Sequence, residues 1–231
     1  MTETIHFGGR QIEFRLVYSS RKSLGITVTP EMKVLVKAPA DTSIEKVKEK
    51  IRKKASWIIK QQSYFLSFQP KTPVRKFISG ETHLYLGRQY RLKIIPGKFE
   101  AVKLKGKFIE VTTNEKARAR QLVSDWYLQN ARLKFHSIGR PLIEKFRKYK
   151  VEPTSIVFRY MPTRWGSCTP KGKIILNPEL IKAPKGCIEY VIIHELCHLI
   201  HHDHTQKFID LQTKEMKYWE KWKAKLEKLL A

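Results

Sequence analysis

The sequence predicts an α+β fold in two regions, and three observations support this. Residues 1–113 contain short apolar segments of strand length separated by glycines and turns, which indicates a small antiparallel sheet. One long amphipathic helix, over about residues 43–67, lies among these strands. Residues 114–231 instead contain long helical patterns and one helix that is apolar on almost every side, which indicates a compact, helix-rich domain around it.

The first strands are predicted from the alternation of apolar and polar residues. A strand with one buried face places every second side chain in the core. This pattern occurs at residues 12–18, 26–28 and 34–36, and a turn at Thr29–Met32 separates the last two. The amino-terminal region therefore begins with a strand followed by a hairpin.

The helix over about residues 43–67 follows Ser43 or Thr42, both of which are common N-cap residues. Its apolar residues recur every three to four positions, and its other face is rich in lysine. This pattern is typical of a surface helix. The lysine-rich face fits an anionic partner, although such faces are usually only solvated.

The remaining amino-terminal strands lie between residues 76 and 113. Four glycines divide this stretch into short apolar segments, which predicts a small antiparallel sheet. A long helix follows from about Asn114, and we place the boundary between the regions 1–113 and 114–231 at its start. Gly139–Arg140–Pro141 is expected to break or kink this helix, because proline lacks an amide donor and clashes with the preceding turn.

The most informative stretch is His194–Glu195–Leu196–Cys197–His198. Two histidines four residues apart project from the same face of a helix, so both imidazoles can reach one small cation. Glu195 is then placed to accept a proton from an attacking water. This HExxH pattern is typical of zinc hydrolases. The alternative is a buried helix that carries these residues by chance, which the cost of burying unpaired polar groups disfavours.

A catalytic zinc site needs three protein ligands and an open position. His204 is the preferred third ligand, because it lies ten residues after His194, as in the HExxHxxGxxH motif. His201 replaces the glycine of that motif, so the chain has to leave the helix differently. Glu215, from the next predicted helix, and His201 itself are the two alternatives.

A second informative stretch precedes the histidines. Residues 155–159 and 173–176 have the pattern of strands, and Arg164–Trp165–Gly166–Ser167–Cys168 lies between them. In a zinc hydrolase, a strand beside the metal helix can pair with an extended substrate. Arg164 and Trp165 are therefore candidate substrate-binding residues, with Arg164 holding an oxyanion or a phosphate. In the alternative interpretation, Trp165 packs in the core and Arg164 caps a carbonyl.

Together these motifs resemble the YgjP-like metallopeptidase domain proteins, which are related to the SprT-type zinc proteins. The resemblance extends over nearly the whole chain and rests on Tyr18–Ile59, Gly80–Tyr90, Met161–Cys168 and Ile188–Phe208. It implies a compact zincin-like domain around a buried HExxH helix. It also implies zinc ligands at His194, His198 and His204, and a catalytic Glu195. Nucleotide pyrophosphatase activity has also been ascribed to this family.

The composition limits the classes of binding partner and the cellular compartment that we expect. The net charge is +25, and it is spread along the chain as +14 in residues 1–112, +7 in 113–150 and +4 in 151–231. Such a surplus attracts phosphates or nucleic acid, unless it only reflects lysine-coated helices. Three cysteines do not suggest a disulfide framework. We find no signal peptide and no run of membrane-spanning length, so we expect a cytoplasmic protein without membrane contact.

Three functions follow from these observations. The first is a zinc-dependent metallopeptidase that cleaves a peptide or protein substrate. The second is a metal-dependent nucleoside triphosphate pyrophosphatase, which the absence of an acidic cluster for Mg²⁺ disfavours. The third is a nucleic-acid-associated protein in which the zinc is structural.

Overall fold

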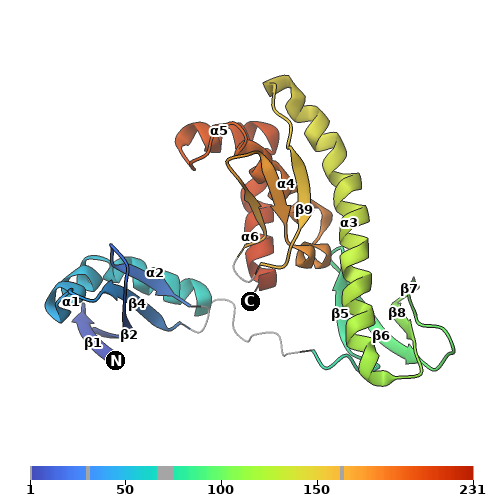
Figure 1. The fold of residues 1–231 in the computed structure, drawn as a ribbon, viewed down its shortest axis with the longest axis horizontal. Helices are drawn as coiled ribbons and strands as arrows, with labels where there is room; N and C mark the ends of the chain where they lie inside the picture. Colours follow the sequence, from blue (N-terminus) through green and yellow to red (C-terminus); the bar gives the residue numbers. More distant parts are fainter. Residues whose placement is uncertain (1, 30–31, 67–74, 162–163, 231) are drawn as a thin grey trace. The chain divides into compact units, whose positions relative to one another are not determined.

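The computed structural model describes residues 2–29, 32–66, 75–161 and 164–230 (Figure 1). The fold is α+β, as predicted. The chain divides into two compact units, residues 1–73 and 74–230. Each unit has its own hydrophobic core.

The first unit is a four-stranded sheet followed by two helices. The strand order is β1-β2-β4-β3, with a parallel pair, β2–β4, between two antiparallel pairs. The expected strands are present, and β1 is an addition. It pairs with β2 across Gly8–Gly9, which have φ angles of 53° and 75°. Positive φ at both positions suits a two-residue hairpin turn and favours glycine. The strands are β1 (Thr2–Phe7), β2 (Arg10–Ser19), β3 (Gly25–Val28) and β4 (Val34–Pro39).

The predicted long helix of this unit consists of two helices, α1 (Ile44–Lys53) and α2 (Ala55–Leu66). Ser43 is the N-cap of α1, as expected. Lys54 separates the two helices, with φ and ψ of −105° and 6°, while its amide still donates to the carbonyls of the preceding turn. Val47, Ile51, Ala55 and Ile58 are fully buried.

The second unit begins with a sheet of the same topology. Its strand order is β5-β6-β8-β7, again with the parallel pair in the centre. The prediction of an antiparallel sheet is right for the outer pairs and wrong for β6–β8, because the sequence pattern does not show which distant strands pair. The strands are β5 (Thr82–Tyr85), β6 (Arg88–Ile95), β7 (Ala101–Lys105) and β8 (Phe108–Thr112).

Helix α3 (Ala119–Phe146) runs through Pro141 without ending. Of the two predicted outcomes at residues 139–141, the break is therefore wrong, and the kink stays a prediction. Gly139 is buried, a Cβ built on it would lie 3.6 Å from Cδ1 of Ile192, and Phe146 beyond the proline is fully buried. Packing of this last part of the helix against the core compensates for the hydrogen bond that proline cannot make.

A third sheet and three further helices complete the second unit. The sheet order is β10-β11-β9, so β10 is an edge strand, antiparallel to β11, and β9 is parallel to β11. These elements are β9 (Ser155–Phe158), β10 (Gly166–Cys168), β11 (Lys173–Leu176), α4 (Lys185–Cys197), α5 (Gln206–Glu215) and α6 (Trp219–Leu230).

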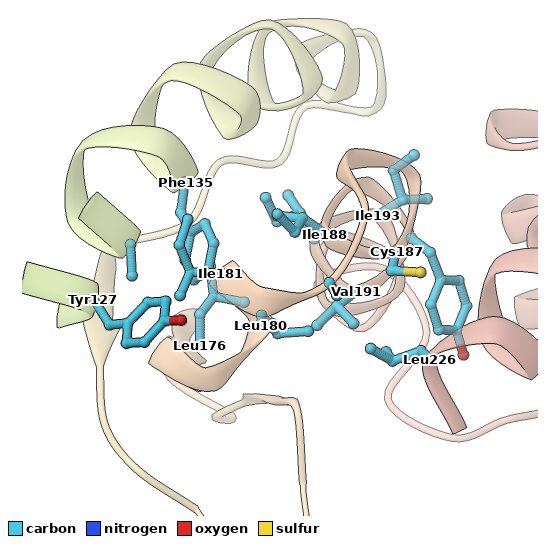
Figure 2. Packing of buried hydrophobic residues seen from close by; sticks show 14 of the residues in the cluster. Tyr127, Phe135, Leu176, Leu180, Ile181, Cys187, Ile188, Val191, Ile193 and Leu226 are labelled. Atoms are coloured by element: carbon cyan, nitrogen blue, oxygen red, sulfur yellow. The ribbon is translucent and has the colours of Figure 1, made fainter. Parts of the chain in front are cut away.

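Helix α4 lies in the middle of the second core. Figure 2 shows its Cys187, Ile188 and Val191 among side chains from other elements, including Phe135 of α3 and Leu226 of α6. Side chains of the β5–β8 sheet belong to the same core. The predicted boundary after residue 113 therefore lies inside the second unit. Within the described part of the chain, no helix combines the length and the apolar character needed to cross a membrane.

Candidate metal centre

Helix α4 brings the first two candidate ligands together. Its residues from Tyr190 to Ile193 and from Glu195 to Cys197 are buried, so the helix is held on almost all sides. His194 lies in its last turn, and His198 is its C-cap. A buried helix is a rigid support, which a metal site requires. His204 comes from the segment between α4 and α5 and is exposed.

The three histidines converge on one point. A ring nitrogen from each of His194, His198 and His204 can be chosen so that all three lie within 4.8 Å of one another. The Nε2 atoms of His194 and His204 are 3.1 Å apart. Two nitrogen ligands of one tetrahedral zinc ion are about 3.3 Å apart, given zinc–nitrogen distances of about 2.0–2.1 Å. The spacing of these donor atoms therefore fits one zinc ion.

Two of the imidazoles are oriented by hydrogen bonds on their far side. Nδ1 of His194 lies 2.8 Å from Oε1 of Gln212, and Nδ1 of His198 lies 3.2 Å from the carbonyl of His201. Both partners accept, which places the proton on Nδ1 and leaves the lone pair on Nε2. Metal-binding histidines usually have such a partner.

Burial also favours the neutral form that binds metals. It lowers the pKa of His194 to about 4, and it lowers the pKa of His198 below its usual value. Both imidazoles are therefore neutral at pH 7. Three imidazole nitrogens form a donor set that suits zinc among other transition metals. The residues present thus fit the metal ion that the sequence predicts.

Neither alternative ligand belongs to the cluster of donor atoms, and the carboxylate of Glu215 is engaged elsewhere. The carboxylate of Glu215 accepts a hydrogen bond from Tyr149 at 2.5 Å and forms ion pairs with Lys145 and Lys148, both at 2.9 Å. His201 contributes its backbone carbonyl to the site, as the acceptor for His198. The chain leaves α4 without the glycine of the longer motif. Residues 198–205 are all described, and none of them has a positive φ angle.

Glu195 lies against the second motif. Its side chain is buried, and the amide of Cys168 in β10 donates a hydrogen bond to it. A Cβ built on Gly166 would lie 2.5 Å from Oε1 of Glu195. Burial raises the pKa of Glu195 to about 8, against the opposing effects of Arg164 and of the Cys168 amide.

The three histidines and Glu195 line one open cleft of about 560 Å³. Arg164 lines this cleft, whereas Trp165 does not, and its ring packs against the core. The cleft is lined by Arg164, Gly166, Ser167, Cys168, Pro170, His194, Glu195, His198, His202 and His204.

Sequence reasoning missed two residues that support this site. Gln212 orients His194, and the buried Asn177 holds the loop before β10 by donating to the carbonyls of Met161 and Arg164, at 2.8 and 3.0 Å. The sequence offers a weak signal for Gln212 only: a polar residue on the apolar face of α5, beside Phe208 and Leu211. The Asn177 contacts join residues 16 and 13 positions apart, and the sequence pattern does not show such pairings.

Comparisons with known proteins identify the family of this chain. The model of the family described as YgjP-like, metallopeptidase domain, matches residues 22–229, which include both motifs, most of the first unit and almost all of the second. No curated protein and no solved structure gives a significant match. The family supports a metal-dependent hydrolase of the peptidase type, and its match covers most of the 231-residue chain. The chain belongs to the YgjP-like metallopeptidase domain family.

Proposed function

We propose that this protein is a zinc-dependent hydrolase that cleaves peptide bonds, with Glu195 as its general base. The observation that carries the proposal is the position of the Glu195 carboxylate, buried at the wall of the cleft that the three histidines also line. His194, His198 and His204 would hold the ion. When bound, zinc supplies a Lewis acid that polarises a carbonyl and lowers the pKa of water towards about 7.

Glu195 moves the proton in this reaction. In its ionised form, which the positive charge of a bound metal ion would favour, its carboxylate accepts a proton from the water whose oxygen attacks the scissile carbonyl carbon. It then donates that proton to the amide nitrogen as the carbon–nitrogen bond breaks. The hydrogen bond from the Cys168 amide and the close approach of Gly166, both in β10, support this position of the carboxylate.

The surroundings of the site support an extended peptide as substrate. Strand β10 lines the cleft and pairs with β11 on one side only, so its other edge is unpaired among the described strands. An extended chain can add to such an edge through backbone hydrogen bonds. Arg164 at the cleft offers a guanidinium to a carbonyl oxygen on which negative charge develops.

The same lining argues against the pyrophosphatase alternative. Glu195 is the single carboxylate among the described residues that line the cleft. Hydrolysis of nucleoside triphosphates usually uses Mg²⁺ held by carboxylates. Peptide hydrolysis needs one carboxylate beside the metal ligands, and this cleft provides one.

The test is the Glu195→Gln variant, assayed for zinc content and for turnover of a quenched fluorescent peptide library. We expect turnover to fall about 100-fold or more with zinc content unchanged. Glu189→Gln is the matched control, because Glu189 lies on the same helix, pairs with Lys185 and does not line the cleft. Full activity of Glu195→Gln would contradict the mechanism. Pyrophosphate release from nucleotides without any peptide cleavage would contradict the substrate.

A further inference from the structure

The first unit contains a groove that the hydrolase site does not use. Its volume is about 230 Å³, and it is lined by Leu24, Ile26, Lys50, Lys54 and Trp57. The two apolar residues lie at the start of β3, an edge strand of the sheet. Lys50 lies in α1, Lys54 lies between the two helices and Trp57 lies in α2, and all three side chains line this groove.

Trp57 is not needed by the core of this unit. Its neighbours Ala55 and Ile58 are fully buried, whereas Trp57 is 42% exposed. An indole on the outside of a helix, at the wall of a groove, offers an aromatic face to a ligand. Aromatic faces of this kind stack with nucleic-acid bases.

The charge around the groove favours an anion. Residues 44–60 contain seven Lys and Arg and two Asp and Glu. Among the described residues, Glu49 forms its ion pair with Lys53, and Lys48 forms its pair with Glu3. Lys50 and Lys54 form no ion pair with any described residue, so both ammonium groups are available to a ligand.

We propose that this groove binds single-stranded nucleic acid, with a base stacked on Trp57 and backbone phosphates contacting Lys50 and Lys54. A single strand satisfies both the aromatic and the cationic groups. A duplex keeps its bases stacked within the helix and cannot cover the indole. An acidic peptide would satisfy the lysines and leave the indole in water. The surplus of eight positive charges in residues 1–73 extends the attraction for a polyanion beyond the groove.

The experiment measures fluorescence anisotropy of a labelled oligothymidine with the full-length protein, at about 50–200 mM salt. Trp57→Ala is expected to weaken binding about tenfold, and Trp57→Phe, which keeps a ring, to weaken it less. Lys50→Gln with Lys54→Gln is expected to reduce the slope of log affinity against log salt by about 1.4, the value for two phosphate contacts.

The double variant Lys22→Gln, Lys46→Gln is the matched control. Both residues are exposed in the same unit and lie outside the groove, and their substitution removes the same two positive charges. This pair is expected to change affinity less than the groove pair. Zinc content and peptide turnover should not change in any of these variants, which shows that the second unit is intact. Equal weakening by the two double variants would overturn the proposal, as would unchanged affinity in Trp57→Ala. Binding of polyglutamate without binding of oligothymidine would assign the groove to an acidic protein instead.

Discussion

Gly166 of β10 lies so close to Glu195 of α4 that a Cβ on the glycine would be 2.5 Å from Oε1 of the carboxylate and 2.9 Å from its Cγ. The two residues belong to different motifs, almost thirty positions apart in the chain. Their contact explains why a glycine stands beside the HExxH helix: the carboxylate occupies the space that any other side chain would need. The strand and the helix thus form one site.

Gly166→Ala should therefore displace the carboxylate while leaving the histidines in place. We expect peptide turnover to fall about 100-fold, because a displacement of a catalytic group by about 1 Å can reduce the reaction rate by about that factor. Zinc content should be unchanged. Gly139→Ala is the control, since its Cβ would meet Ile192 at an ordinary 3.6 Å within helix α3. Full turnover in Gly166→Ala would show that Glu195 does not act from this position.

Gln212→Leu should weaken metal binding without removing a ligand. Oε1 of Gln212 accepts a hydrogen bond from Nδ1–H of His194, and loss of such a partner typically costs about 10–100-fold in metal affinity. Competition with a zinc chelator measures this change. Gln206→Leu, at the exposed start of the same helix, should leave the affinity unchanged. An unaltered affinity in Gln212→Leu would mean that this hydrogen bond does not orient the ligand.

Arg164→Ala should lower kcat/KM for peptides about tenfold through the loss of one charged contact to the substrate. Arg164→Lys, which keeps the positive charge, should retain part of the native kcat/KM. The zinc content should not change, because Arg164 is not a ligand. The matched control is Arg159→Ala, at an exposed position outside the cleft. Unchanged kcat/KM in Arg164→Ala would exclude a role in substrate binding.

Glu215 should stabilise the second unit in a pH-dependent way. Burial raises the pKa of this carboxyl, but hydrogen bonds from Tyr149, Lys148 and Lys145 outweigh this effect and lower the pKa to about 2. The usual pKa of a glutamate is about 4.3, so the folded state favours the charged form. The contribution is present at neutral pH and is lost as the pH falls below about 5 towards 2.

Urea unfolding of Glu215→Gln measures this contribution. We expect a loss of about 2 kcal/mol at pH 7, because the hydrogen bonds to a charged acceptor are weakened. The difference from the native protein should shrink as the pH falls towards about 2. Glu220→Gln, on an exposed position of α6, should have almost no effect. A difference that is constant with pH would contradict the assignment of this ionised carboxylate.

The sequence predicts the parts of the site that are local. Helical spacing places His194 and His198 on one face, and the offset of ten residues brings His204 to the same point. The sequence does not predict the contacts between segments that are distant in the chain. The packing of Gly166 on Glu195 and the hydrogen bond from His194 to Gln212 depend on how β10 and α5 fold against α4, which residue spacing does not encode.

The fold shows the same limit. Alternation and glycines predict most strands of the two four-stranded sheets, because these signals are carried by each segment alone. The parallel pairs β2–β4 and β6–β8 join strands that are not consecutive, so the predicted antiparallel arrangement is wrong at the centre. Pro141 predicts a break that core packing of Gly139 and Phe146 prevents. In both cases tertiary contacts outweigh the local preference.

The most direct test of the account is the zinc content of the purified protein, measured beside the His204→Ala variant. We predict about one zinc per chain in the native protein, and a sharp loss in the variant, because a site of two histidines lacks one of the three protein ligands. His136→Ala, an exposed histidine of α3, is the control and should keep its zinc. Zinc retained unchanged in His204→Ala, or no zinc in the native protein even after zinc is added, would contradict the three-histidine site.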